Sequence, residues 1–201
     1  MHSAEAVPEW LSVLSRCIAV VLLGAGCGGG ENSAAIEKKG EPAMAITVTS
    51  EAFKAKAAIP KKHTGEGADT SPPLAWSGVP AGTKELALIC DDPDAPVAEP
   101  WVHWVIYGIP PDAKGLPEGV PTQETLQEPQ GARQGLNDFR KAGYGGPMPP
   151  RGHGTHHYYF RLYALDSGLN LPPRQTKKKL LEAMKGHILA QGELVGTYER
   201  K

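Results

Sequence analysis

Short hydrophobic segments separated by polar turns recur along the chain and predict β-strands. Glu85 to Cys90 is almost continuously apolar, which is typical of a strand buried on both faces or in the core of a sandwich. Trp101 to Ile109 is the next expected strand. Its period of two places Trp101, His103 and Val105 together on one face.

A third strand is expected from His156 to Leu165, directly after a loop rich in Gly and Pro. Alternation places His156 and Tyr158 on one face of this strand and His157 on the other. Shorter strands are expected at residues 44–50, 71–76 and 193–199, and a long functional or mobile loop at residues 112–143. Most of the predicted elements are therefore strands.

One segment shows helical periodicity. Residues 176–191 place apolar side chains three and four apart, with Thr176 as the expected N-cap and Gly192 as the stop. Composition agrees with one helix among many strands, because 24 Gly and 19 Pro with 6 % aromatic residues favour strands and turns over a helical bundle. We expect one all-β dominated domain with a C-terminal helix, which 201 residues suffice to form.

The N-terminal segment has the layout of an export signal. An apolar run at residues 18–25 follows Arg16 and precedes Cys27, and it is shorter than the about 20 residues that span a bilayer. The small residues before Cys27 resemble a bacterial lipoprotein signal, in which Cys27 is lipidated; the alternative is an ordinary cleaved signal. We expect a signal peptide at 1–26, a flexible tether at 27–42 and the domain at 43–201.

Charge and cysteine content exclude several classes of function. From Cys27 onward, acidic and basic residues are equal in number, so no global positive field attracts nucleic acid. Once the signal is removed and Cys27 is lipidated, Cys90 is the one remaining thiol. A disulfide framework or a Cys-based zinc site cannot be built from a single thiol, and Cys90 is expected to be a small buried hydrophobic residue.

Polar side chains that can bind an anion occur at three of the predicted strands. Asp92 and Asp94 follow the first strand, His103 lies in the second, and His156 and Tyr158 open the third. A sandwich can bring these five side chains to one mouth. His and Tyr donate hydrogen bonds to anionic oxygens, and a carboxylate can orient a His. Taken singly, an Asp beside a proline is also typical of a turn, and a strand His of a satisfied core residue.

Three segments together resemble the phosphatidylethanolamine-binding protein family, also called the Raf kinase inhibitor protein family, in its bacterial branch. They are Asp-Pro-Asp-Ala-Pro at 92–96, the strand around His103, and the Gly/Pro-rich segment 144–160. The resemblance implies an antiparallel β-sandwich with a small cavity for phosphate, phosphoethanolamine or acetate. It assigns to this cavity Asp92, Asp94, His103, Pro150, His156 and Tyr158, with Gly146 at the rim. The chain departs from the family at His157, which stands where the family usually has Arg and which alternation turns away from the cavity.

The resulting hypothesis is a non-enzymatic binding protein for a small anionic ligand or a phospholipid headgroup, without a cofactor, exported to the cell envelope and lipid-anchored. An alternative is an inhibitor that acts through its surface on a kinase or, for an exported chain, on a protease. A weaker alternative is a metal-dependent enzyme built on His103, His156 and the Asp pair, although the chain has neither a His-Glu-x-x-His spacing nor a Gly-x-Ser-x-Gly turn.

Overall fold

Two antiparallel sheets form the framework of the protein in the computed structural model, which describes residues 46–201; the expected signal peptide, Cys27 and the tether lie outside these residues. The smaller sheet has the order β1 (Thr47–Thr49), β2 (Leu74–Ser77), β5 (Gly115–Leu116). The larger sheet has the order β6 (Arg133–Gln134), β4 (Trp101–Ile109), β3 (Glu85–Asp92), β7 (Thr155–Leu165), β8 (Ile188–Glu199). The predicted β-dominated antiparallel sandwich is confirmed.

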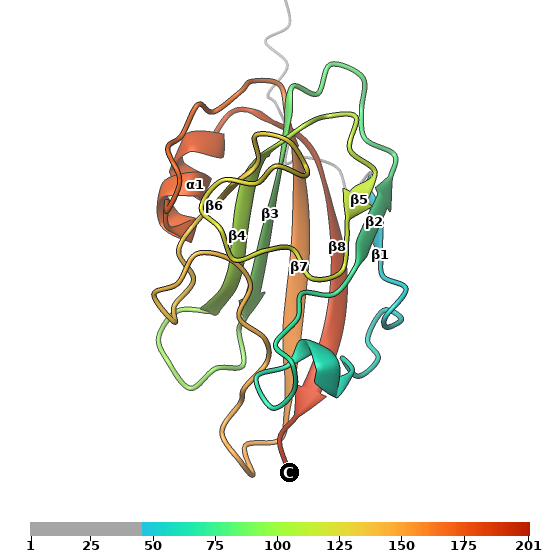
Figure 1. Ribbon diagram of the computed structural model, residues 1–201, viewed down its shortest axis with the longest axis vertical. Coiled ribbons are helices and arrows are strands. Elements are labelled where there is room, and N and C mark those ends of the chain that lie inside the picture. The colour runs from blue at the N-terminus through green and yellow to red at the C-terminus, as the bar shows by residue number, and fades with distance from the viewer. Residues whose placement is uncertain (1–45) are drawn as a thin grey trace, which may run out of the picture. The chain divides into compact units, whose positions relative to one another are not determined.

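The central strand β3 separates two hydrophobic clusters. All eight of its residues are buried. Leu86, Leu88 and Cys90 pack between the two sheets, and Ala87 and Ile89 pack toward the helix α1 (Lys177–Met184). In Figure 1, α1 and the smaller sheet lie on opposite sides of the larger sheet. The prediction of a strand buried on both faces is confirmed, and it explains why this segment is apolar without alternation.

Strand β4 departs from the strict alternation that its sequence predicts. Trp104 pairs with Cys90 and Val102 pairs with Asp91, so His103 is an extra residue on β4 at a register shift. Such a bulge reverses the side-chain phase beyond it. Val102 and Val105 therefore both pack in the helix-side cluster, while Trp104 packs between the sheets. The prediction that Val105 shares a face with Trp101 and His103 is wrong.

The C-terminal helix is shorter than its periodicity predicts. Thr176 is the N-cap, and its side chain accepts a hydrogen bond from the backbone N–H of Lys179 at 3.3 Å. The helix ends at Met184, before Gly186 with φ of +85°, a left-handed conformation that favours glycine. Residues 188–191 pair with β7 instead of continuing the helix, because a ladder partner overrides helical propensity. No helix among residues 46–201 has the length and apolar character needed to cross a membrane.

The long loop expected at residues 112–143 contains the two short strands β5 and β6 and is anchored by Gln134. The side-chain amide of Gln134 donates to the carbonyl oxygens of Pro121 and Gln123, at 2.6 and 2.7 Å, and accepts from the indole N–H of Trp104 at 2.8 Å. Gln134 is fully buried, so these three bonds satisfy its amide. They hold the loop against β4, close to the segment that carries Asn137 and Phe139.

Candidate functional site

A cavity of about 220 Å³ lies at the end of the larger sheet where β3 ends and β4 and β7 begin. Five of the seven residues that the sequence assigns to the cavity line it: Asp92, His103, Pro150, His156 and Tyr158. The other lining residues are Ala95, Pro96, Val97, Trp101, Phe139, Met148 and Pro149. Three segments far apart in sequence therefore converge at one site, an arrangement that a sandwich allows.

Asp92 and His156 form a buried pair in the cavity wall. The Nδ1–H group of His156 donates to Oδ2 of Asp92 at 2.7 Å, and the two side chains are 1 % and 4 % exposed. The backbone N–H of Asp94 donates to Oδ1 of Asp92 at 2.9 Å. Both carboxylate oxygens of Asp92 thus have a donor, and the imidazole of His156 is held in one orientation.

His103 enters the cavity from the bulge in β4. Its Nδ1–H group donates to the carbonyl oxygen of Gly145 at 2.6 Å, and its ring is buried against the edges of Phe139 and Tyr158, with centroid distances of 5.5 and 5.0 Å. Burial lowers the pKa of His103, although the Gly145 carbonyl and the Asp92 carboxylate act in the opposite direction. His103 is therefore neutral near pH 7, with its proton on Nδ1.

The hydroxyl of Tyr158 has no hydrogen-bond partner. It is the one buried side-chain polar atom without a partner among residues 46–201, and Tyr158 is 1 % exposed. Burial, with a smaller contribution from the Asp92 carboxylate, raises the pKa of Tyr158 well above its ordinary value. The hydroxyl thus keeps its proton and remains available as a donor, at the expense of an unmet hydrogen bond in the ligand-free protein.

Asp94 lies outside the cavity, which corrects the assignment taken from the family. Its carboxylate accepts from the backbone N–H and from the Nδ1–H group of His157 at 2.8 and 2.7 Å, in a pair whose side chains are 41 % and 45 % exposed. His157 faces away from the cavity, as alternation predicts. Its hydrogen bonds orient the Asp94 carboxylate away from the cavity as well. The physical reason is that Asp94 falls beyond the end of β3, where its direction is set by this local pair and not by the sheet.

Gly146 also lies outside the cavity and supports the rim from behind. Its N–H group donates to Oδ1 of Asp69 at 2.6 Å, and a Cβ atom at this position would stand 2.6 Å from the carbonyl oxygen of His63. The Tyr144 hydroxyl donates to that same carbonyl at 2.7 Å. Gly146 is therefore a residue of close backbone packing and not a cavity wall, because a side chain would separate the rim from the loop behind it.

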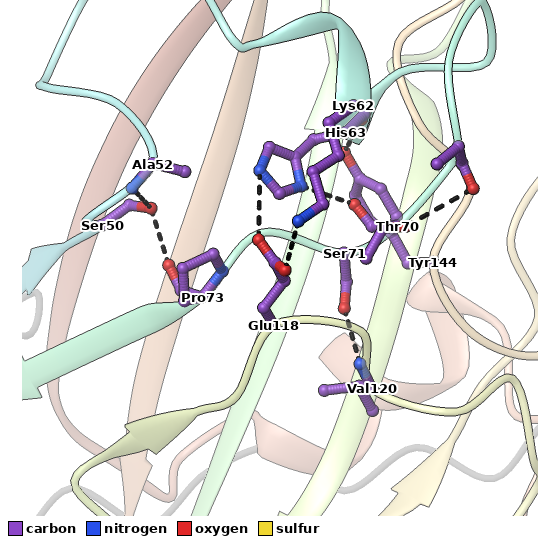
Figure 2. A network of polar contacts seen from close by, with 11 residues as sticks. Ser50, Ala52, Lys62, His63, Thr70, Ser71, Pro73, Glu118, Val120 and Tyr144 are labelled. Atoms are coloured by element: carbon purple, nitrogen blue, oxygen red, sulfur yellow. Dashed lines mark hydrogen bonds and ion pairs between the residues drawn. The ribbon is translucent and has the colours of Figure 1, made fainter.

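The loop behind the rim is itself held by a network of polar contacts (Figure 2). The Nδ1–H group of His63 donates to the carbonyl oxygen of Thr70 at 2.8 Å, and His63 ends the short 3₁₀ helix η1 (Lys61–His63). The Ser71 hydroxyl accepts from the backbone N–H of Val120 at 2.9 Å. This network fixes the segment whose Asp69 carboxylate and His63 carbonyl position Gly146 and Tyr144.

Sequence reasoning missed the apolar mouth of the cavity. Four large hydrophobic side chains are exposed among residues 46–201, and three of them line this cavity: Val97, Phe139 and Met148, at 52 %, 39 % and 40 % exposure. They lie in loops without periodicity, so no pattern marked them as exposed. The mouth therefore combines a polar floor with an apolar rim.

His153 is a second residue that sequence reasoning set aside. Its Nδ1 atom lies 2.7 Å from Nε2 of His156, which places an exposed imidazole next to the buried one. One of the two nitrogen atoms must carry the shared proton. Only the spacing of three residues between the two histidines pointed to this contact. Among residues 46–201, no group of three or more His, Cys, Asp or Glu side chains is arranged to hold a metal ion.

Comparison with known proteins finds relatives over nearly the whole described part of the chain. The family model described as phosphatidylethanolamine-binding protein matches residues 49–199. A UPF0098 protein of Pyrococcus horikoshii is 47 % identical over 182 residues, which cover 90 % of this chain and 86 % of the relative. A Mycobacterium tuberculosis protein named "Putative lipoprotein LppC" is 38 % identical over 200 residues, covering 94 % of this chain and 95 % of the relative.

Two crystal structures share the fold. A homolog of phosphatidylethanolamine-binding protein from Chlamydia trachomatis is 43 % identical with a TM-score of 0.70, covering 78 % of this chain and 99 % of that chain. The Escherichia coli protein YbcL is 36 % identical with a TM-score of 0.73, covering 78 % of this chain and 99 % of that chain. Nearly the full length of both relatives thus corresponds to 78 % of this chain.

Proposed function

Because the chain belongs to the phosphatidylethanolamine-binding protein family, we propose that it binds a phosphate-bearing headgroup in the cavity formed by Asp92, His103, His156 and Tyr158, without catalysing a reaction. Phosphoethanolamine is the reference ligand. The volume of about 220 Å³ supports a small ligand, since it lies below the range of about 300–1,000 Å³ of drug-sized sites.

The observation that carries the proposal is the Tyr158 hydroxyl, which is buried, protonated and without a partner at a cavity wall. A buried hydroxyl without a hydrogen bond destabilises the protein by about 1–3 kcal/mol. A ligand oxygen that accepts from Tyr158 removes this penalty, so binding and stability are coupled at one atom. The buried Asp92–His156 pair next to it supplies fixed polar groups with little freedom to lose on binding.

The apolar rim supports a headgroup that is attached to an apolar remainder. Val97, Phe139 and Met148 line the same cavity as the buried polar side chains and are exposed in the ligand-free protein. A phospholipid presents a phosphate group followed by a glycerol and acyl chains, which matches a polar floor below an apolar mouth. We expect a short-chain phosphatidylethanolamine to bind more tightly than phosphoethanolamine, and a Phe139→Ser variant to lose that difference.

Titration of the purified chain with phosphoethanolamine, followed by NMR, tests the proposal. The signals of His103 and His156 are expected to shift, and the double variant with both residues changed to Ala is expected not to bind. Tyr158→Phe is expected to weaken binding about five- to tenfold, through the loss of one hydrogen bond of about 1 kcal/mol. Tyr159→Phe is the matched control, because Tyr159 lies one residue away, does not line the cavity, and packs under Arg161.

A surface-acting protease inhibitor would give the opposite pattern. It would inhibit equally in the parent chain and in the Tyr158→Phe variant, and neither would bind phosphoethanolamine. This result would replace the proposal with the alternative drawn from the sequence.

Export and lipid anchoring through Cys27 are also proposed. The apolar run before Cys27 supports them, as does the similarity over 94 % of this chain to the mycobacterial relative that carries the lipoprotein name. Expressed in a bacterium, the chain is expected to fractionate with membranes and to carry acyl chains on Cys27 by mass spectrometry. A Cys27→Ser variant that stays equally membrane-bound would refute anchoring at this residue.

A further inference from the structure

The cavity proposed to bind an oxyanion lacks the cations that usually neutralise one. None of its lining residues, all within residues 46–201, is Lys or Arg. It does contain the carboxylate of Asp92, which is buried and has no ionic partner other than His156 among the described residues. An anion without protons would therefore place its oxygens near a negative group in a site of low dielectric constant, which is unfavourable.

His103 adds a second acceptor to the cavity. The carbonyl oxygen of Gly145 can only accept, so the hydrogen bond at 2.6 Å places a proton on Nδ1 of His103. The ring is 3 % exposed, and burial favours its neutral form. A neutral imidazole with its proton on Nδ1 presents a lone pair on Nε2. His103 thus offers the ligand an acceptor and not a donor.

The Nε2 atom of His156 is also an acceptor when the ring is neutral. Its Nδ1–H group faces the Asp92 carboxylate, which fixes a proton on Nδ1, and its Nε2 atom faces Nδ1 of His153 at 2.7 Å. When His156 is neutral, its Nε2 atom accepts from His153 and has no proton to give to a ligand. Tyr158 is then the one side chain of the cavity floor with an O–H group to donate.

We propose that the cavity selects an oxyanion that carries an acidic proton, such as a phosphate monoester monoanion, because His103 Nε2 and Asp92 accept while Tyr158 donates. This inference rests on the proposed function and specifies the ionic form of its ligand. The P–OH group of a monoester monoanion donates to one of the acceptors, and its other oxygens accept from Tyr158. A sulfate ester of the same size and charge has no such proton and leaves the acceptors facing bare oxygens.

The proposal makes binding dependent on pH through the ligand. The second pKa of a phosphate monoester is about 6, so the protonated form declines about tenfold per pH unit above that value. The carboxylates that act on the charge of His103 are Asp91, Asp92 and Asp138, of which Asp92 lines the cavity, and His156 and Tyr158 line the cavity beside it. The three carboxylates raise the pKa of His103, whereas burial lowers it, and the effect of burial is the larger one.

Methyl phosphate and methyl sulfate form the test pair, since both carry one negative charge at about pH 5 and differ in one acidic proton. We expect calorimetry with the purified chain at about pH 5 to give about ten- to a hundredfold tighter binding of methyl phosphate than of methyl sulfate. This range is expected because the P–OH group donates a hydrogen bond to an acceptor that repels the corresponding oxygen of the sulfate. Affinity for methyl phosphate is expected to fall at least about tenfold by about pH 8. Nitrogen NMR of the complex at about pH 7 is expected to show His103 neutral, with its proton on Nδ1.

Equal binding of the two esters at about pH 5 would overturn the proposal while leaving the oxyanion site intact, and so would a His103 that gains a second proton in the complex. If neither ester nor phosphoethanolamine binds at any pH, the proposed function fails together with it. The variant His103→Gln, whose amide can turn an N–H group toward the anion, is expected to bring the two affinities toward parity. The nitrogen NMR measurement on the parent chain keeps the test decisive if this variant does not fold.

Discussion

His156 donates to Asp92 over 2.7 Å in the buried cavity wall, with side chains 1 % and 4 % exposed, and His157 donates to Asp94 over the same distance at the surface. The two pairs are neighbours in sequence and equal in length, but they differ in burial. Burial removes the competing water, so the inner pair is expected to contribute far more to stability than the outer one.

The substitutions Asp92→Asn and Asp94→Asn measure this difference. We expect Asp92→Asn to lower the free energy of unfolding by about 1–3 kcal/mol, because a buried imidazole loses a charged acceptor. Asp94→Asn is expected to change it by about 0–1 kcal/mol, as is usual for exposed pairs. Urea denaturation of the two variants beside the parent chain checks both values, and equal losses would contradict this account of the cavity wall.

Removal of the Tyr158 hydroxyl is expected to stabilise the ligand-free protein. Tyr158→Phe deletes a buried polar atom that has no partner, so the free energy of unfolding is expected to rise by about 1 kcal/mol. The same variant is expected to gain less stability than the parent chain from added phosphoethanolamine. Thermal unfolding with and without ligand tests both effects. A less stable variant in the absence of ligand would show that the hydroxyl is satisfied in solution.

His103 is expected to make stability depend on pH. Its folded pKa is lowered by burial, whereas the unfolded chain has the ordinary His value of about 6.5. Below about pH 6.5 the unfolded chain therefore binds a proton that folded His103 does not, and the free energy of unfolding decreases as pH falls toward the folded pKa. Between about pH 7.5 and about pH 5.5, the parent chain should lose more stability than His103→Gln. Parallel curves for the two proteins would refute a buried neutral His103.

Substitutions at Gly146 and Gly152, which lie in one loop, test two different roles of glycine. Gly146 allows close packing, and Gly152 allows a left-handed backbone conformation. A Cβ atom on Gly146 would stand 2.6 Å from the His63 carbonyl oxygen, whereas Gly152, with φ of +74°, has no atom within 4 Å of that position. We expect Gly146→Ala to lower the free energy of unfolding by about 1–3 kcal/mol and to weaken ligand binding by displacing the rim. Gly152→Ala is expected to cost about 1 kcal/mol without affecting binding.

Much of the fold could be predicted from the sequence, because the relevant signals are local. The apolar run of β3, the bounds of β4 and the N-cap at Thr176 follow from composition and spacing within a few residues. The end of α1 did not, since residues 188–191 are drawn into β8 by pairing with β7, a partner that the local periodicity does not contain.

The candidate site divides in the same way. The family resemblance implies that Asp92, His103, His156 and Tyr158 share one cavity, and strand phase places His156 and Tyr158 on one face. The direction of His103 depends on the bulge in β4, which the alternation of residues does not reveal. The outward turn of Asp94 depends on two hydrogen bonds from His157, and the exposure of Phe139 depends on how the loop from Asn137 is held. Neither leaves a pattern in the sequence, because loop direction is set by tertiary contacts.

The extra residue at His103 also determines which changes in sequence strand β4 can tolerate. Substitutions leave this register in place, whereas deletion of Val102 removes the extra residue and places His103 opposite Asp91, on the helix-side face that Val102 now occupies. Such a chain would keep nearly all hydrogen bonds of the ladder and still turn its imidazole away from the cavity. The length of this strand, more than the identity of its residues, is therefore the property that a functional descendant of this chain has to preserve.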